Sequence, residues 1–207
     1  MSVSIYALKP RFQGLLRPGV RQLARLGVTA NQVTTLACLV SVALGLTLYL
    51  APLPPAAFAL VPLWLLLRMA LNAIDGMLAR EHGQQSVLGA YLNELTDVLA
   101  DAALYLPLAK VAPFSPLWIG VIVLAAALSE MAGALGQTVG AGRRYDGPMG
   151  KSDRAAVFGA LGLAVALLAG PEGLPAAWHG LAWVLPAVAA LTGVSVVNRV
   201  RAGLPAR

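Results

Sequence analysis

The chain has 207 residues, of which 58% are hydrophobic and only 12% are charged. Soluble domains carry about 25% charged residues, so this composition excludes an ordinary water-soluble protein. Uncharged stretches of at least about 18 residues are typical of membrane-spanning helices. Residues 26–67, 111–129 and 173–198 are such stretches. We therefore predict an integral membrane protein.

The formal net charge of +6 is compatible with a nucleic-acid partner, but the distribution of charge is not. Most basic residues lie at the ends of apolar segments, where orientation signals and anionic lipid contacts are found. We therefore expect membrane lipids, and no nucleic acid, as partners. The single cysteine, Cys38, excludes an intrachain disulfide.

Residues 1–32 contain five basic residues and no acidic residue. Apolar residues recur among the arginines at roughly helical spacing, which predicts an amphipathic helix on an anionic membrane surface. A merely basic cytoplasmic tail is the alternative. Pro18 is expected to break or begin this helix. The apolar residues are Leu15, Leu16, Val20, Leu23 and Leu26.

The remaining residues, 33–207, are predicted to form one all-α membrane domain, a polytopic bundle of six transmembrane helices. Backbone groups in lipid must be satisfied within helices or closed barrels, and Pro-rich or polar links separate the apolar segments. The predicted spans are Val33–Ala51, Ala56–Ala79, Leu88–Ala109, Leu117–Val139, Ala155–Gly170 and Trp178–Asn198.

Six spans place both termini on one side of the membrane. That side would hold every Lys and Arg except Arg68, within a span, and Lys110, on the opposite side. Positive charge favours the cytoplasmic side. We therefore predict a multi-pass protein of the cytoplasmic (inner) membrane, with both termini and the polar segment 72–97 facing the cytoplasm.

The polar segment 72–97 lies at the ends of two apolar spans. Its residues recur at spacings that place them on one face of each helix. Oxygen ligands and small residues on two facing helices would suit a hard cation beside a phosphate. The first face holds Asn72, Asp75, Gly76, Ala79 and Arg80, and the second holds Gly89, Asn93, Asp97 and Asp101.

This segment closely resembles the signature of the CDP-alcohol phosphatidyltransferase family, D-x2-D-G-x2-A-R-x8-G-x3-D-x3-D. Every spacing matches, and six of the eight signature positions match in identity: Asp75, Gly76, Ala79, Arg80, Gly89 and Asp97. The sequence TANQVT at 29–34 and the loop GKSDR at 150–154 are also similar to the family. The resemblance covers most of the chain.

The resemblance implies a metal-dependent transferase of phospholipid biosynthesis. Such an enzyme moves a phosphoalcohol, often phosphatidyl, from a CDP-linked donor such as CDP-diacylglycerol to a small alcohol and releases CMP. It implies Mg²⁺ or Mn²⁺, as one or two ions, at Asn72, Asp75, Asn93 and Asp97. Asp97 would also be the catalytic base. Similar proteins are commonly homodimers.

The resemblance also implies roles for residues that are not metal ligands. Gly76, Ala79 and Gly89 would let the nucleotide lie close to the helices, and Arg80 would support the site or neutralise phosphate. A basic group follows the fourth span, and in relatives this region binds the acceptor's phosphate or lipid head groups. Ordinary cytoplasmic charge is the alternative. The group is Arg143, Arg144, Lys151 and Arg154.

The chain departs from the signature at two acidic positions, which are the amides Asn72 and Asn93. An amide oxygen can bind a hard cation, but two negative charges are lost. Asp101 or Glu94 could compensate, and Asp101 has the better spacing. Three interpretations remain open: a working enzyme with a modified site, an enzyme selective for an unusual substrate, or a catalytically lost relative.

Rival functions follow from the same features. A catalytically lost protein could remain a CDP-lipid-binding scaffold or regulator, and a small transporter is a weaker alternative. Within the spans, Arg68 and Glu130 could line an acceptor pocket or form an ion pair, such as Arg68 with Glu130 or Asp101. His82 and His179 have no partner at metal-ligand spacing and are interpreted as incidental.

Overall fold

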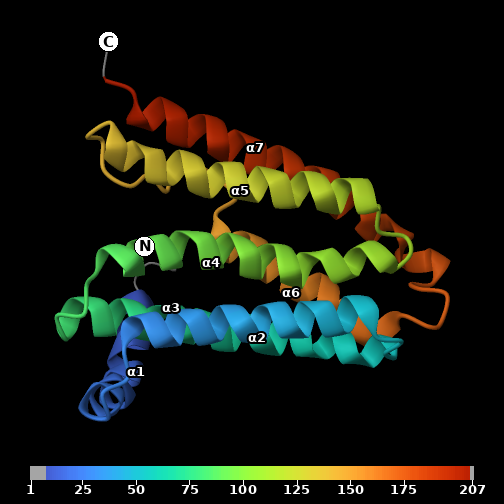
Figure 1. The fold of residues 1–207 in the computed structure, drawn as a ribbon. Coiled ribbons are helices and arrows are strands. Elements are labelled where there is room, and N and C mark those ends of the chain that lie inside the picture. The colour runs from blue at the N-terminus through green and yellow to red at the C-terminus, as the bar shows by residue number, and fades with distance from the viewer. Residues whose placement is uncertain (1–7, 206–207) are drawn as a thin grey trace. The chain divides into compact units, whose positions relative to one another are not determined.

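The structure is a computed structural model that describes residues 8–205, and side chains from Phe12 onward. Within this range the chain is helical and contains no strand, which confirms the all-α prediction (Figure 1). The start of the predicted segment 1–32 and the C-terminal Arg207 lie outside the described residues. The long helices are α1 (Leu8–Arg25), α2 (Ala30–Leu50), α3 (Leu60–Glu81), α4 (Val87–Tyr105), α5 (Pro116–Thr138), α6 (Lys151–Leu168) and α7 (Val184–Gly203).

Three of the predicted spans begin or end in a tighter 3₁₀ turn. The turns are Pro55–Ala59 before α3, Leu106–Lys110 after α4 and Ala176–Trp183 before α7. The end of the predicted span Ala56–Ala79 is wrong by two residues, because α3 continues to Glu81. Gly83 follows with a φ of +64°, a left-handed conformation that readily ends a helix.

The prediction that Pro18 breaks or begins the first helix is wrong, because α1 runs through it from Leu8 to Arg25. A proline inside a helix removes one backbone hydrogen bond, to the residue four positions earlier. Here both Pro18 and Gly14 are exposed. Solvent can therefore hydrate the carbonyl that the helix leaves without a donor.

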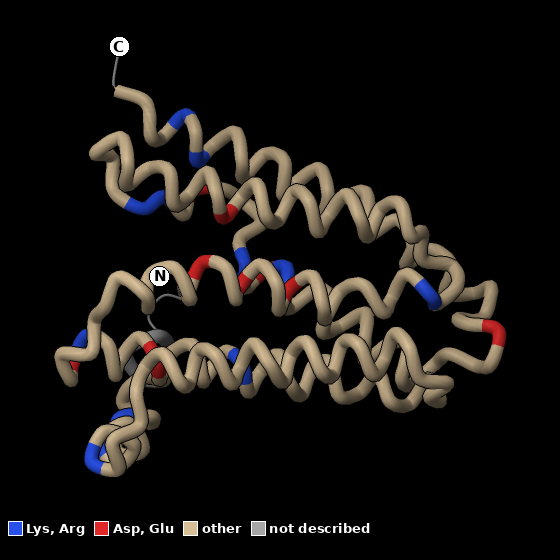
Figure 2. Tube along the Cα trace, in the orientation of Figure 1, with Lys and Arg blue, Asp and Glu red and all other residues tan. Residues whose placement is uncertain are grey.

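Four segments are long and apolar enough to cross a membrane: Ala30–Leu50, Pro55–Glu81, Pro116–Thr138 and Ala176–Gly203. The prediction of six spans is therefore supported for four. The helices α4 and α6 coincide with the other two predicted spans, but they are shorter, with 19 and 18 residues, and each carries three charged residues within that length, including Glu94 in α4 and Lys151 in α6. Figure 2 shows the tube of α2 without a charged position.

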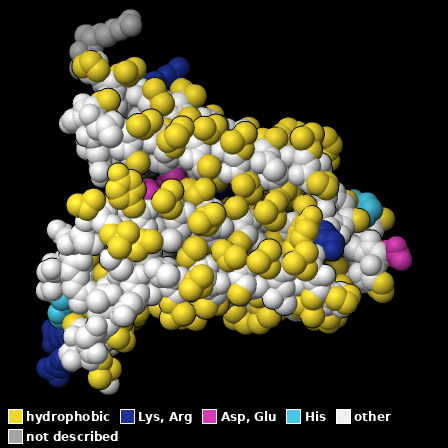
Figure 3. All heavy atoms as spheres, viewed as in Figure 1, with side chains coloured by type: hydrophobic (Ala, Val, Ile, Leu, Met, Phe, Trp, Pro, Cys, Tyr) yellow, Lys and Arg dark blue, Asp and Glu magenta, His cyan; other side chains and the backbone are white. Residues whose placement is uncertain are grey.

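Large apolar side chains are exposed along these helices, as a protein surrounded by lipid requires. Leu36, Leu39 and Leu46 of α2 are each more than half exposed. Figure 3 shows hydrophobic side chains over much of the visible face. Because exposed apolar patches of this extent are not stable in water, these surfaces support membrane insertion.

The chain forms two compact units. The first comprises residues 1–40 and 66–97 and therefore contains α1 and the whole segment 72–97. Its core consists of Val20, Ala30, Val33, Met77 and Leu78. The second comprises residues 41–65 and 98–207. In it, α5 and α7 lie side by side (Figure 1), and Tyr105 stacks on Phe158 with ring centroids 3.7 Å apart.

Candidate functional site

The first signature carboxylate, Asp75, is buried on α3 and is held by a residue of α2. The hydroxyl of Thr34 donates a hydrogen bond to Oδ2 of Asp75 over 2.7 Å. Thr34 closes the stretch TANQVT at 29–34, where the sequence shows its second similarity to the family. The start of α2 therefore positions the first acidic group of the candidate site.

The second signature carboxylate, Asp97, forms a salt bridge on α4. Nη2 of Arg68 donates to Oδ1 of Asp97 over 3.1 Å and to its main-chain oxygen over 3.2 Å. The Arg68 side chain is only 4% exposed. This pairing differs from the partners that the sequence suggested for Arg68. The double contact fixes the orientation of the Asp97 carboxylate.

The two amides of the signature lie one turn before these carboxylates. Asn72 is half-buried on α3 and Asn93 is exposed on α4. Within residues 8–205, the structure gives neither amide side chain a hydrogen bond. Both amide oxygens therefore remain available to a ligand.

The donor set of these four residues consists only of oxygen, the ligand atom that Mg²⁺ and Mn²⁺ prefer. In the part of the chain that the structure describes, no group of three or more His, Cys, Asp or Glu side chains is placed to hold a metal. Arg68 also neutralises much of the charge of Asp97. Two carboxylates and two amides thus fit one hard cation better than two.

Two signature glycines make room for neighbouring polar side chains of the protein itself. A β-carbon at Gly76 would lie 3.0 Å from Nη2 of Arg80, one turn later on α3. A β-carbon at Gly89 would lie 2.7 Å from Oδ1 of Asn31 and 3.0 Å from Oγ of Ser86. Both positions are therefore small because a side chain passes over them, a reason that spacing alone does not reveal.

The remaining signature residues differ in exposure. Ala79 is half-buried and packs against the core of the first unit. Arg80 is exposed and forms no ion pair with any residue from 8 to 205. Its guanidinium lies over Gly76 and is available to an anionic ligand.

The polar link after α3 is fastened to the start of α2 by Gln84, which the sequence analysis did not single out. Oε1 of Gln84 accepts a hydrogen bond from the Ala30 amide over 2.7 Å, and Nε2 donates to the Val28 carbonyl over 3.3 Å. A glutamine that satisfies a helix N-terminus leaves no periodic signal in a sequence. This contact could not have been found by spacing.

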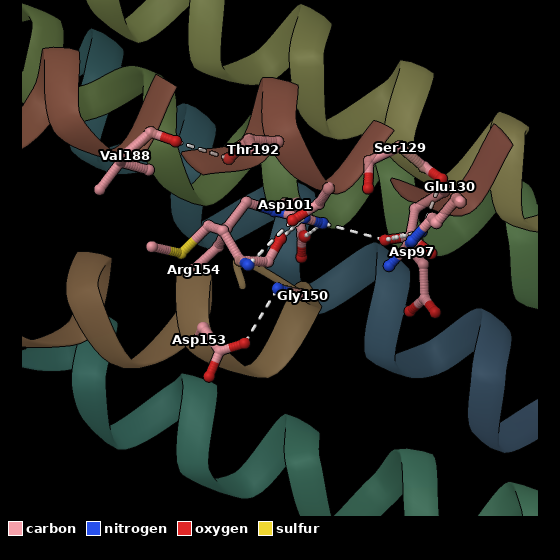
Figure 4. A network of polar contacts seen from close by, with 12 residues as sticks. Asp97, Asp101, Ser129, Glu130, Gly150, Asp153, Arg154, Val188 and Thr192 are labelled. Carbon is pink, nitrogen blue, oxygen red and sulfur yellow. Dashed lines mark hydrogen bonds and ion pairs between the residues drawn. The ribbon is translucent and has the colours of Figure 1, made fainter. Parts of the chain in front are cut away.

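In the second unit, three arginines surround one buried glutamate, Glu130. Figure 4 shows Glu130 together with one of these arginines, Arg154. Glu130 of α5 accepts from Nη2 of Arg154 over 3.1 Å and from Nη2 of Arg143 over 3.2 Å. Nη1 of Arg199 lies 3.5 Å from the same carboxylate. Arg154 is fully buried and also lies 3.6 Å from Asp101. Asp101, which the sequence offered as a compensating acid, is thus part of this arginine network.

The four residues of the predicted basic group are not equivalent. Arg143 and Arg154 are bound to Glu130. Arg144 forms a bidentate pair with Asp146, with nitrogen–oxygen distances of 2.9 and 3.1 Å. That hydrogen bond holds the pKa of Asp146 below its ordinary value. Lys151 begins α6 and is half-buried.

The loop that carries this group is folded back onto α5 and α7. The Arg144 amide donates to the Gly133 carbonyl over 3.0 Å, and the Ala141 amide donates to the Gly136 carbonyl over 2.9 Å. Oγ of Ser195 accepts from the Met149 amide over 2.9 Å. The loop is therefore ordered by its own backbone, which sets the positions of its basic side chains.

Comparison with known proteins identifies relatives along nearly the whole chain. Residues 27–195 match the CDP-alcohol phosphatidyltransferase family. The inner membrane protein YnbA of Escherichia coli (strain K12) is 44% identical over 202 residues, covering 98% of this chain and 97% of that protein. The family resemblance noted in the sequence is thus confirmed by an independent comparison.

Solved structures of Mycobacterium tuberculosis phosphatidylinositol phosphate synthase (PgsA1) share the fold. Its complex with manganese and citrate matches with a TM-score of 0.70 and 22% identity, covering 90% of this chain and 87% of that one. Its structure with CDP-DAG bound also has a TM-score of 0.70 and 22% identity, covering 90% and 92%. The chain is therefore a member of the CDP-alcohol phosphatidyltransferase family.

Proposed function

We propose that the protein transfers a phosphatidyl group from CDP-diacylglycerol to a small alcohol and releases CMP. The observation that carries this proposal is the pair of signature carboxylates, each held by a dedicated partner: Asp75 by Thr34 and Asp97 by Arg68. Such fixed orientation is what a catalytic site needs, because positioned groups need no reorganisation during the reaction. The CDP-DAG complex of the mycobacterial synthase supports the donor class.

Asn72, Asp75, Asn93 and Asp97 would hold one divalent ion, Mg²⁺ or Mn²⁺. The manganese complex of the mycobacterial synthase supports this choice. A bound ion supplies neutralising charge to the pyrophosphate of the donor. The protein supplies the four oxygen donors and the Arg68 salt bridge that orients Asp97.

Asp97 is the proposed general base. Its carboxylate takes the proton of the acceptor hydroxyl as that oxygen forms a bond to the phosphorus next to the lipid alcohol. The bond between this phosphorus and the bridging oxygen of the pyrophosphate breaks, and CMP leaves with the bridging oxygen. No oxidant or further reactant is required, since the proton passes to Asp97 and the electron pair leaves with CMP.

The exposed Arg80 would bind the departing phosphate, because its guanidinium has no ion-pair partner among residues 8–205. Gly76 and Gly89 would serve the site by making room for the side chain of Arg80 and for those of Asn31 and Ser86. On the acceptor side, Arg144 and Lys151 would contact the substrate. Arg143 and Arg154 would instead position the loop through Glu130.

The membrane topology and the orientation of the site are inferred from the charge pattern. We infer six spans within residues 33–207 and an interfacial segment over 1–32, with the termini and the site on the cytoplasmic side. YnbA of Escherichia coli carries the name inner membrane protein, which supports the inner membrane. We infer a homodimer as the assembled form.

The test is CMP release by the purified protein in lipid nanodiscs with CDP-diacylglycerol, Mn²⁺ or Mg²⁺, and a panel of small alcohols. Acceptor-dependent release should occur and should be lost in Asp97→Asn. Glu172→Gln, a change at an exposed acid of the α6–α7 connection, is the matched control and should keep full activity. A fully active Asp97→Asn protein would show that Asp97 is not the base.

A CDP-lipid-binding scaffold remains the second candidate, because Asn72 and Asn93 carry no charge. It predicts CDP-diacylglycerol binding without CMP release under every condition. Restoring both acids, by Asn72→Asp with Asn93→Asp, should then create activity where none existed. CMP release by the unaltered protein would exclude the scaffold interpretation.

A further inference from the structure

Outside the candidate site, the first unit contains a cleft with a basic lining. Its volume is about 400 Å³, and it is lined by Arg21, Ala24 and Arg25 of α1 and by His82, which directly follows α3. The residues come from two segments far apart in the sequence. None of them belongs to the family signature, and His82 is interpreted as incidental from the sequence alone.

The cleft is built by a clamp between α1 and the end of α3. Arg17 donates to both carboxylate oxygens of Glu81, over 3.1 Å from Nε and 3.0 Å from Nη2. Val20, one turn later in α1, is fully buried in the core of the first unit. These two contacts fix the rotation of α1 and bring its next two arginines beside His82.

Helical spacing explains which cations reach the cleft. Arg17, Arg21 and Arg25 are four residues apart, so they share one flank of α1. Arg17 is used by Glu81, and the two arginines that follow point along the same flank. His82 is the next residue after Glu81, which places its imidazole beside them.

Within the described residues, the three polar side chains of the cleft form no salt bridge. Among residues 8–205, neither Arg21 nor Arg25 nor His82 forms an ion pair or side-chain hydrogen bond, since the nearby Glu81 is engaged by Arg17. Two guanidinium groups offer forked donors that match phosphate oxygens. A protonated imidazole would add a third charge.

The opposite flank of α1 is apolar, and it would determine the depth of the cleft relative to the membrane surface. A second hollow of about 350 Å³ is lined mainly by apolar residues, among them Leu15, Leu23, Leu26 and Ile74. An amphipathic helix places such a flank in the acyl boundary of a membrane. The basic flank, whose Arg21 and Arg25 are exposed, would then lie at the depth of lipid phosphates.

We propose that the cleft between α1 and His82 binds a terminal phosphate group carrying about two negative charges. The lipid source would be a phosphomonoester head group, and the soluble source would be free phosphate. Both offer the same three terminal oxygens to Arg21, Arg25 and His82. This site is separate from the transferase proposal and does not depend on it.

The chain has only two histidines, His82 and His179, which allows a direct test by NMR. The full-length protein, labelled at histidine and placed in phosphatidylcholine nanodiscs, is titrated with inorganic phosphate. Nε2 of His179 donates a hydrogen bond to the Leu174 carbonyl over 3.0 Å, and this residue serves as the internal control. The lipid arm compares discs containing phosphatidic acid with discs containing phosphatidylglycerol at equal total surface charge.

Phosphate binding should shift the ring resonances of His82 while those of His179 stay constant. The Arg21→Gln/Arg25→Gln protein should lose this shift, with apparent affinity reduced at least about tenfold. Arg201→Gln, which removes an exposed arginine of α7, should behave as the unaltered protein. An unchanged His179 signal reports that each variant is folded.

The phosphate titration and the lipid comparison together identify whether the ligand is soluble or part of a lipid. A shift with free phosphate in neutral discs supports a soluble ligand, and a shift only with phosphatidic acid supports a lipid ligand. Three results would overturn the proposal: no His82 shift in any arm, an equal shift in the double variant, or an equal shift with phosphatidylglycerol. The last would mean that His82 responds only to surface charge.

Discussion

The Arg68 guanidinium of α3 and the Asp97 carboxylate of α4 form a nearly buried salt bridge, with Nη2 and Oδ1 3.1 Å apart. Removing one partner of a buried pair leaves the other charge without compensation. Arg68 is therefore a positioning residue for the proposed base. It also contributes to the stability of the first unit.

We expect Arg68→Ala to lower the free energy of unfolding by about 3–5 kcal/mol and to abolish most CMP release. Thermal unfolding in detergent and the CMP assay measure the two effects. The Arg68→Ala/Asp97→Ala protein should be more stable than the Arg68→Ala protein, because it no longer contains an uncompensated carboxylate. A double variant that is less stable than either single one would contradict this coupling.

Glu130 is bound by three arginines, so its loss should leave several buried positive charges close together. We expect Glu130→Gln to reduce the unfolding free energy by about 3 kcal/mol, measured by chemical or thermal unfolding. Glu172→Gln changes an exposed glutamate in the same way and should be neutral within about 0.5 kcal/mol. Equal stability of the two variants would show that the arginine network contributes nothing.

The glycines of α5 provide a matched pair for the loop after it. A β-carbon at Gly136 would collide with the Gly142 carbonyl and would lie 2.8 Å from Cγ of Arg144, whereas at Gly120 it would meet nothing within 4 Å. Gly136→Ala should therefore cost about 1–3 kcal/mol and increase proteolysis of the loop. Gly120→Ala should be neutral or stabilising by up to about 1 kcal/mol. Identical effects would mean that the loop does not pack as described.

Because Asn72 and Asn93 are uncharged, we expect the site to bind metal with low affinity and expect carboxylates at these positions to raise that affinity. Asn72→Asp combined with Asn93→Asp should tighten Mn²⁺ binding at least about tenfold, because anionic oxygens bind hard cations more strongly than amide oxygens. Electron paramagnetic resonance of free Mn²⁺ measures the affinity. Asn198→Asp in α7 adds charge elsewhere and is the control. Unchanged affinity in the double variant would place the metal outside these residues.

Acid should loosen the loop that contains Asp146. The hydrogen bond from Arg144 lowers the pKa of Asp146, so the folded loop favours the ionised carboxylate. This contribution is complete above the ordinary aspartate pKa of about 4 and is lost as the pH falls through the lower folded value. The protection of residues 140–150 from hydrogen exchange, relative to an unfolded chain at the same pH, should therefore fall below about pH 4. In the Asp146→Asn protein, this protection should not depend on pH over that range.

The sequence predicted the helical class and the approximate position of every long helix, because uncharged runs and proline-rich links are strong local signals. It missed the 3₁₀ turns and the continuation of α1 through Pro18, since both depend on local hydration and packing. The count of six spans stays a prediction beyond the four segments that meet the length and composition of a span.

The candidate site shows the same division. Fixed spacing identified Asp75 and Asp97, because chemistry that needs several residues on two helices leaves a long pattern. The supporting contacts of Thr34, Arg68 and Gln84 were not identified, since each joins segments that are 29 to 54 residues apart. A single sequence carries no record of such pairings. They emerge only when the helices are placed together.

The contact between Gly76 and Arg80 limits how this chain can vary. The guanidinium of Arg80 occupies the space that a side chain at position 76 would need. A larger residue at position 76 would therefore displace the Arg80 guanidinium from the surface of α3. A shorter residue at position 80 would expose the backbone of Gly76 to solvent. These two positions should consequently change together or not at all during evolution. In protein design, positions 76 and 80 should therefore be varied together.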